Sequence, residues 1–145
     1  MILFYEFLTL WSLLIHILDV RFNIVFLNTY VLSLIVSFFG LYITYYIKEL
    51  NIGKIKLQGK TLFVIDFIFH QLPFIYMLLN HDFYKKRYTS QHTCLTVLFI
   101  CIYYIFIDIY KVYKFNKNKT KTKHVLLFTL FSVVVLLYNS SMLNE

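Results

Sequence analysis

The segment from Thr61 to Asn80, TLFVIDFIFHQLPFIYMLLN, constrains the fold of this chain more than any other. It is an apolar run of 20 residues, which is the length that an α-helix needs to cross the hydrocarbon core of a bilayer. Asp66 and His70 lie four residues apart inside it, so they share one face of the helix. Ionisable side chains at that depth are costly, and they mark a candidate functional site.

Composition favours a membrane environment for most of the chain. Of its 145 residues, 60% are apolar and 14% are charged, and one domain of this size cannot bury so much apolar surface in water. The apolar residues gather in five segments, at about 2–18, 24–47, 61–80, 92–112 and 124–139. We therefore predict an all-α fold: a polytopic membrane helical bundle formed by one domain, residues 1–145, with five transmembrane helices, or four if the first segment is only interfacial.

The connections between these segments carry most of the charge. The first two segments are joined by residues 19–23, which we predict to form a tight turn between helices. Residues 48–60 contain two glycines and four lysines, a composition that predicts a loop or an amphipathic turn at the membrane interface. The other two segments that are rich in Lys and Arg are 85–87 and 111–123.

The distribution of Lys and Arg predicts an orientation. With five spans, ten of these residues fall on the side of the N-terminus and four on the opposite side. The positive-inside rule then places the N-terminus in the cytosol, or in a matrix, and the C-terminus outside. The absence of alanine and the abundance of Phe, Tyr, Ile, Asn and Lys indicate an AT-rich genome. A viral or host endomembrane and the mitochondrial inner membrane are both compatible with it.

The same lysine-rich loops bear on the expected partners. Clusters of this kind next to apolar helices favour contacts with the anionic headgroups of a lipid bilayer. They do not form the folded basic face on which nucleic acid binds, so we expect no nucleic-acid partner. Other membrane subunits, or a second copy of the chain, are the expected protein partners.

Small and hydroxylated side chains form a stripe along the second segment. They are spaced four, four, three and four residues apart, which places all of them on one helical face: Thr29, Ser33, Ser37, Gly40 and Thr44. Such residues let two helices approach closely, and the hydroxyls can bond across the interface. We interpret this stripe as a helix-packing seam rather than a substrate groove.

Pro73 interrupts the hydrogen bonding of the third segment. Because proline has no backbone N–H, the carbonyl of Phe69 loses its helical partner, and the helix is expected to kink there. The freed carbonyl lies beside His70, and we predict that it accepts a hydrogen bond from the imidazole ring.

Antiparallel packing of the helices assigns depths to the polar residues. Glu6, Asp66 and Asp108 each lie about four to six residues from the basic side of their helices, which is roughly 6–9 Å. Ion pairs with interfacial lysines would account for these three carboxylates. His70 is expected near the midplane, at the depth of Ser37 and Cys101, where interfacial water cannot help it.

The Asp66–His70 pair leaves three interpretations open. In the first, it is a structural hydrogen bond in a non-catalytic protein, a structural or accessory subunit of a membrane assembly. In the second, it belongs to a proton or ion pathway lined by Glu6, Asp66, His70 and Asp108. In the third, the chain is an intramembrane enzyme acting on lipid, with His70 as base, Asp66 as its orienting partner and Ser37 or Cys101 as nucleophile.

Recognisable catalytic and cofactor motifs are missing from the sequence. There is no Gly-rich phosphate loop, HExxH, CxxC or Gly-x-Ser-x-Gly. The two cysteines, Cys94 and Cys101, are seven residues apart in one segment, too far along a helix for a mutual disulfide, and we interpret them as small buried side chains. We expect no cofactor and no metal, and we place the non-catalytic interpretation first.

Overall fold

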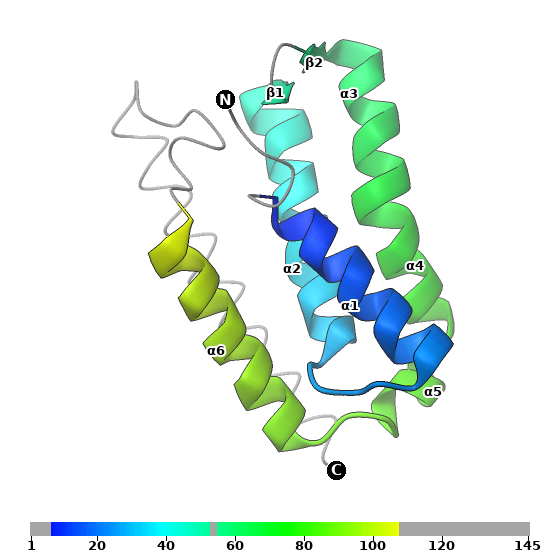
Figure 1. Cartoon of the computed structure of the whole chain (residues 1–145). Helices are drawn as coiled ribbons and strands as arrows, with labels where there is room; N and C mark the ends of the chain where they lie inside the picture. Colours follow the sequence, from blue (N-terminus) through cyan, green and yellow to red (C-terminus); the bar gives the residue numbers. More distant parts are fainter. Residues whose placement is uncertain (1–6, 53–54, 108–145) are drawn as a thin grey trace.

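The computed structural model of the chain describes residues 7–52 and 55–107. Several predicted features lie outside these ranges: Glu6, Asp108, the loop 111–123 and the segment 124–139. Within the described ranges the chain is mostly helical, which confirms the all-α prediction (Figure 1). The elements are α1 Leu8–Phe22, α2 Thr29–Tyr42, η2 Ile43–Ile47, β1 Glu49–Ile52, β2 Ile55–Gln58, α3 Gly59–Asp66, η3 Phe67–Gln71, α4 Leu72–Leu79, α5 His81–Lys85 and α6 Ser90–Phe106.

Two of these elements are single turns of π-helix inside longer helices. η2 continues α2, so that a helix runs from Thr29 to Ile47, and η3 joins α3 to α4, so that another runs from Gly59 to Leu79. Both are long and apolar enough to cross a membrane. The core helix of a soluble protein passes the same test of length and composition, and the five-span topology stays a prediction.

The turn predicted at residues 19–23 is wrong, because α1 continues to Phe22. Asn23 ends the helix with a left-handed backbone (φ 57°), a conformation that asparagine tolerates better than most residues. The N–H groups of Asn23 and Ile24 both donate to the carbonyl of Leu18, which closes the helix end. Asp19 is therefore helical, and the connection to α2 begins four residues later than expected.

The segment 48–60 is also not the loop that its composition predicts. β1 and β2 form an antiparallel hairpin in which Leu50 pairs with Leu57. Both leucines are buried, and they pack in a cluster with Phe7, Ile43 and Leu62. An isolated two-stranded hairpin is marginal in water, so this apolar contact with the helix ends accounts for the strands.

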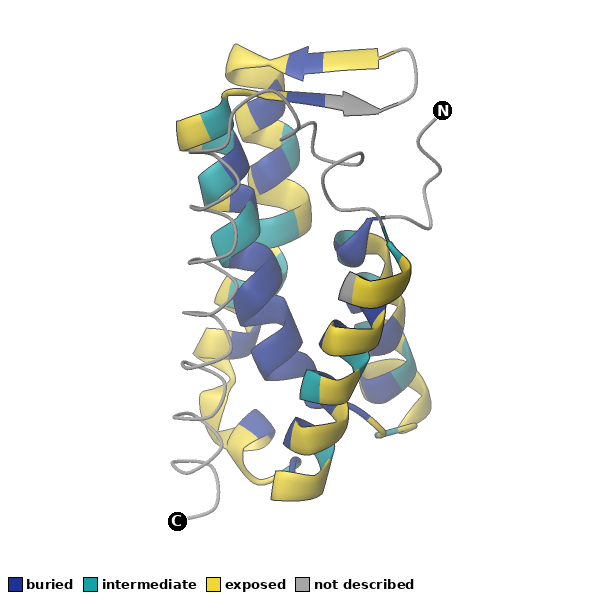
Figure 2. Cartoon of the chain, turned by 90° about the vertical axis from the view of Figure 1, so that its left-hand side faces the viewer, coloured by how far each residue is buried: buried dark blue, intermediate teal, exposed yellow. Residues whose placement is uncertain are grey.

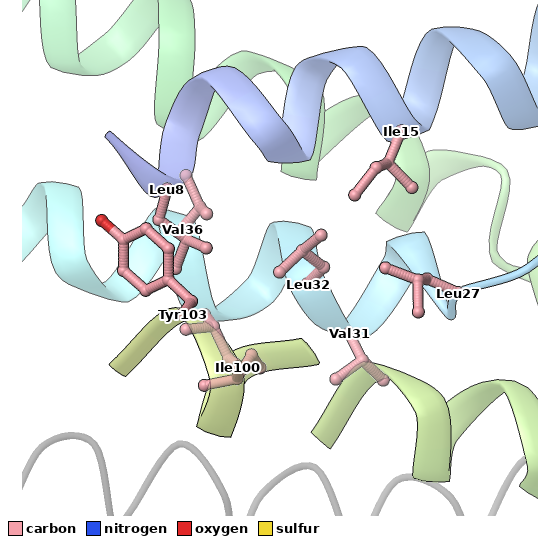
Figure 3. Close-up of a cluster of buried hydrophobic side chains, with 9 residues drawn as sticks. Leu8, Ile15, Leu27, Val31, Leu32, Val36, Ile100 and Tyr103 are labelled. Carbon is pink, nitrogen blue, oxygen red and sulfur yellow. The ribbon is translucent and has the colours of Figure 1, made fainter. Parts of the chain in front are cut away.

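α2 lies at the centre of the molecule. Ten of its residues are buried, and it is the longest dark-blue stretch in Figure 2. α1, α6 and the Gly59–Leu79 helix surround it (Figure 1). The main apolar cluster, shown in Figure 3, joins α1, α2 and α6 through Leu8, Ile15, Leu27, Val31, Leu32, Ile35, Val36, Ile100 and Tyr103.

The two long helices differ sharply in how far the protein covers them. In the most apolar stretch of each, 61% of the Thr29–Ile47 residues are buried, against 17% for Gly59–Leu79. Large apolar side chains on the latter are exposed, among them Phe63, Phe67, Leu72, Ile75 and Leu79. The described part of the protein therefore presents an apolar exterior along this helix.

Candidate functional site

The local structure of the site starts from Pro73. This residue lies at the beginning of α4, and the turn before it, η3, is π-helical, with the Leu72 N–H donating to the carbonyl of Phe67. A π-turn adds one residue to the helical turn, which accommodates the missing proline N–H without ending the helix. Asp66 and His70 then face α2 and α1.

His70 binds side chains with both ring nitrogens. Its Nδ1 lies 2.6 Å from Oδ1 of Asp66, and its Nε2 lies 2.8 Å from the hydroxyl of Thr9 on α1. The predicted bond from the imidazole to the freed carbonyl of Phe69 is therefore wrong, because neither nitrogen is available for it. The side chains of Asp66 and His70 are only 4% and 12% exposed, so the pair lies in a closed contact between helices.

Gln71 connects the same pair to α2. Its amide nitrogen donates to Oδ2 of Asp66 at 3.3 Å and to the backbone carbonyl of Ser37 at 3.0 Å. Its amide oxygen accepts a bond from the hydroxyl of Ser37 at 2.6 Å. The sequence analysis did not single out Gln71, although it is polar and directly follows His70 in an apolar run.

Gly40 is what allows this contact to form. A Cβ built on Gly40 would lie 2.0 Å from Oδ1 of Asp66 and 2.4 Å from Nδ1 of His70. Both atoms are held by their mutual hydrogen bond, so neither can move aside without breaking it. The glycine of the stripe on α2 thus faces the acid–imidazole pair directly.

The other members of the predicted packing seam are also turned inward. Thr29, Ser33 and Ser37 are buried with Gly40, whereas Thr44 is half-buried and its hydroxyl has no hydrogen-bond partner within the described residues. Thr29 and Ser37 each bond to a different neighbouring element. The stripe therefore connects two polar sites, the second of which the sequence analysis missed.

This second site surrounds Asp19, which is 1% exposed. Nε of Arg87 lies 2.5 Å from its Oδ1, and its Oδ2 accepts bonds from the hydroxyls of Thr29 and Tyr88. Arg87 also donates to the backbone carbonyl of Asp19 at 2.7 Å and to Asn23 at 2.9 Å. One signal was available in the sequence, because the connections containing Asp19 and Arg87 were predicted on the same side of the membrane.

Asn28 and two tyrosines complete this end of the bundle. Asn28 caps α2 by accepting from the N–H of Val31, and its amide donates to Thr93 on α6 at 3.1 Å. Burial raises the pKa of Tyr84 to about 12. Burial and then the hydrogen bond to Asp19 raise the pKa of Tyr88 still further, so both rings stay neutral at physiological pH.

The remaining candidates are not brought to His70. Cys94 and Cys101 are exposed on α6, so their interpretation as buried apolar side chains is wrong, and no described contact joins Cys101 to His70. The hydroxyl of Ser37 is occupied by Gln71. The hydroxyl that does reach His70 belongs to Thr9, which the sequence analysis did not consider.

The ion pathway is only partly visible. Two of its four members, Glu6 and Asp108, lie outside the described residues, and the other two bond to each other. In the part of the chain that the structure describes, no group of three or more His, Cys, Asp or Glu side chains is arranged to hold a metal ion. No family model, curated protein or solved structure matches the chain.

Proposed function

We propose that this chain is a multi-pass integral membrane protein that serves as a structural or accessory subunit of a membrane assembly. The observation that carries the proposal is the orientation of the Gly59–Leu79 helix. It is exposed along an apolar surface, yet the ionisable side chains in its middle, Asp66 and His70, point inward.

This arrangement suits lipid better than water. A soluble protein buries apolar side chains and exposes charged ones, whereas a helix in a bilayer does the reverse. The exposed fractions of Phe67, Leu72 and Leu79 are 42%, 50% and 81%, and that of Asp66 is 3%. Contiguous exposed apolar surface of this kind marks a membrane or protein contact.

The dimensions of the fold support a transmembrane orientation. A 21-residue helix such as Gly59–Leu79 is about 31 Å long, close to the thickness of the hydrocarbon core. The β-hairpin lies at one end of this helix and α5 at the other (Figure 1). The hairpin and the basic group 85–87, which follows α5, therefore lie at opposite ends of this helix, as expected for a helix that crosses a bilayer.

The polar contacts favour a structural role for the buried residues. Ser37 and Thr29, both on α2, bond to the Gly59–Leu79 helix and to Asp19 on α1, respectively. Each contact fixes one helix against another. The apolar faces that remain are available to lipid or to neighbouring subunits of an assembly.

Extraction at alkaline pH tests the membrane proposal. The full chain, expressed with a terminal tag in its native host or a yeast membrane, is expected to stay in the pellet after washing with sodium carbonate. A peripheral protein carrying the same tag is the control for release. Recovery of the chain in the soluble fraction would reject the proposal.

The subunit role is tested with the variant Asp66→Asn/His70→Gln. We expect it to reduce the fraction of chain found in large complexes on native gels, because the helix contact is weakened. The matched control is Glu49→Gln/Lys56→Gln, which removes an exposed ion pair on the hairpin. If the Asp66/His70 variant assembles normally while native function is lost, the structural interpretation is wrong.

A further inference from the structure

Three side chains from two helices form a continuous hydrogen-bonded line. The hydroxyl of Thr9 lies 2.8 Å from Nε2 of His70, and Nδ1 of the same ring lies 2.6 Å from Asp66. This is the order of groups by which a hydroxyl is activated for nucleophilic attack: hydroxyl, imidazole and carboxylate.

We propose that Thr9, His70 and Asp66 form a nucleophilic site that transfers acyl groups from membrane lipid esters. The inference goes beyond the structural role proposed above and adds a chemical role to the same helix contact. It also differs from what the sequence predicts, since Thr9 occupies the place expected for Ser37 or Cys101.

With an ionised Asp66 and a neutral His70, the two hydrogen bonds of the ring can form with only one arrangement of the protons. An ionised carboxylate can only accept, so the proton of the neutral His70 ring lies on Nδ1 and points to Asp66. Nε2 is then the acceptor, and the hydroxyl of Thr9 is the donor. The ring is thus held in the tautomer that can remove a proton from Thr9.

Gln71 is a positioning residue for this line. It donates to the second oxygen of Asp66, and its own orientation is fixed by the carbonyl and the hydroxyl of Ser37. Because its amide cannot rotate without losing these bonds, Gln71 restrains the second oxygen of Asp66 while the first bonds to His70. Groups held in this way lose little freedom when the reaction occurs.

The surroundings of Thr9 indicate the class of substrate. Thr9 is half-buried, and the residues that follow it in the chain, Leu10 and Trp11, present apolar surface, 45% and 37% exposed. The start of α1, where Thr9 lies, is therefore bordered by an apolar exterior, while His70 and Asp66 are shielded. An ester with a long acyl chain, already dissolved in the bilayer, is the substrate class that matches these apolar surroundings.

The position of Thr9 also provides a donor for the developing charge. Thr9 is the second residue of α1, and amide groups in the first turn of a helix have no acceptor within the helix. Its own N–H is therefore suited to donate to the oxyanion that forms on the ester carbonyl. The partial positive charge at the helix start acts in the same direction.

The reaction follows two balanced steps. The oxygen of Thr9 attacks the ester carbonyl while its proton passes to Nε2 of His70. The C–O bond of the ester then breaks, and His70 returns that proton to the leaving alcohol. In the second step water gives a proton to His70 while its oxygen attacks the carbonyl of the acyl-Thr9 ester. The bond between the acyl carbon and the Thr9 oxygen then breaks, His70 returns the proton to that oxygen, and a fatty acid is released.

A covalent probe tests the site in the full chain. The protein in detergent micelles is treated with a long-chain alkyl fluorophosphonate, and the adduct is located by peptide mass spectrometry. We expect the adduct on Thr9, and we expect His70→Gln and Asp66→Asn to label at least about 100-fold more slowly. Release of fatty acid from phosphatidylcholine liposomes is expected to fall in parallel.

Two further variants separate chemistry from folding. Thr9→Ser keeps a hydroxyl and is expected to label and to release fatty acid, whereas Thr9→Val, of the same shape, does neither. The matched control is Thr61→Val, which removes an exposed threonine from the first turn of α3 and is expected to label normally. Helical content of every variant is checked by circular dichroism.

The outcomes are decisive in either direction. An absence of adduct in the unaltered chain overturns the proposal, as does an adduct on Thr9 whose rate does not depend on His70. Carbonate extraction is measured on the same samples. A chain that stays in the membrane without reacting rejects the nucleophilic site and leaves the structural proposal standing.

Discussion

Gly40 is the residue at which one missing side chain allows two helices to meet. We predict that Gly40→Ala lowers the free energy of unfolding by about 1–3 kcal/mol, the cost of overpacking a well-packed contact. The added Cβ would fall on Asp66 and His70, both held by their mutual bond. Unfolding of the purified protein in mixed micelles measures the change.

A double-mutant cycle provides the control for this prediction. In an Asp66→Ala/His70→Ala background the obstructing atoms are gone. Gly40→Ala is therefore expected to lower the free energy of unfolding clearly less in that background. An equal cost in both backgrounds would show that the glycine acts through something other than this pair.

Asp19 is the second residue whose replacement is expected to lower the stability of the protein. Asp19→Asn leaves Arg87 without its charged partner, and breaking such a buried pair costs several kcal/mol. Because the side chain of Arg87 is 16% exposed, we predict that the free energy of unfolding falls by about 3 kcal/mol, the lower end of the range for buried ion pairs. The same unfolding measurement applies.

The hairpin supplies the matched control. Glu49 and Lys56 form an ion pair at 3.3 Å with side chains about half exposed, and such pairs contribute less than about 1 kcal/mol. Glu49→Gln is thus expected to change stability far less than Asp19→Asn. Similar losses for the two variants would contradict the assignment of Asp19 as a buried anchor.

At the scale of elements, Asn28 determines how α2 and α6 meet. It is fully buried, caps α2 and binds Thr93, while its backbone N–H donates to Thr96 at 2.7 Å. We predict that Asn28→Ala lowers the free energy of unfolding by about 2 kcal/mol, from the lost cap and the lost hydrogen bond to Thr93. Hydrogen exchange should accelerate in peptides covering Ser90–Phe106.

Asn80 is the control for that prediction. It also lies at a helix end, but it is exposed, and its side chain donates to the nearby carbonyl of Tyr76 rather than to α6. Asn80→Ala is expected to leave exchange in α6 unchanged. If both variants accelerate exchange in α6 alike, Asn28 does not connect the two helices.

The elements show what apolar periodicity can and cannot predict. The long apolar runs correctly predicted helices, because such runs have few alternatives. The end of α1 was misplaced because residues 19–23 interrupt the apolar run and predict a turn, whereas Asp19 stays in the helix with its carboxylate bonded to Arg87 and two hydroxyls. The hairpin was missed because each strand has a single buried leucine, Leu50 or Leu57. The apolar residues that cover these leucines come from other segments of the folded protein.

At the scale of the whole molecule, the two ends of the long helices are expected on opposite sides of the membrane. After Cys94 and Cys101 are replaced by serine, single cysteines are introduced by Lys56→Cys and Lys86→Cys. In sealed vesicles of known orientation, a membrane-impermeant maleimide should react with Lys86→Cys from outside. It should reach Lys56→Cys only after the vesicles are permeabilised.

Labelling of both positions from the same side would reject this topology. Reaction of Lys56→Cys alone from outside would reverse the orientation predicted by the positive-inside rule. The exposed cysteines of α6 serve as an internal reference, because a chain that retains them reports how far the reagent reaches into the apolar region.

Only some residues of the candidate site could be predicted from the sequence, because the site joins distant segments of the molecule. Asp66 and His70 were identified because ionisable residues are rare in apolar runs. Thr9 and Gln71 were not, because a threonine or glutamine carries no such signal until distant segments are brought together. Thr9 and His70 are separated by 61 positions in the chain, and no local pattern specifies that contact.

The short hairpin between η2 and α3 has a consequence for how the protein is made. Because only residues 48–58 separate the two long helices, Gly40 and Asp66 leave the ribosome close together in time. We expect the translocon to receive both helices as a pair. The carboxylate of Asp66 would then already be bonded to His70 and packed against Gly40. Asp66 is then expected to enter the bilayer packed against α2 and not in contact with lipid on all sides.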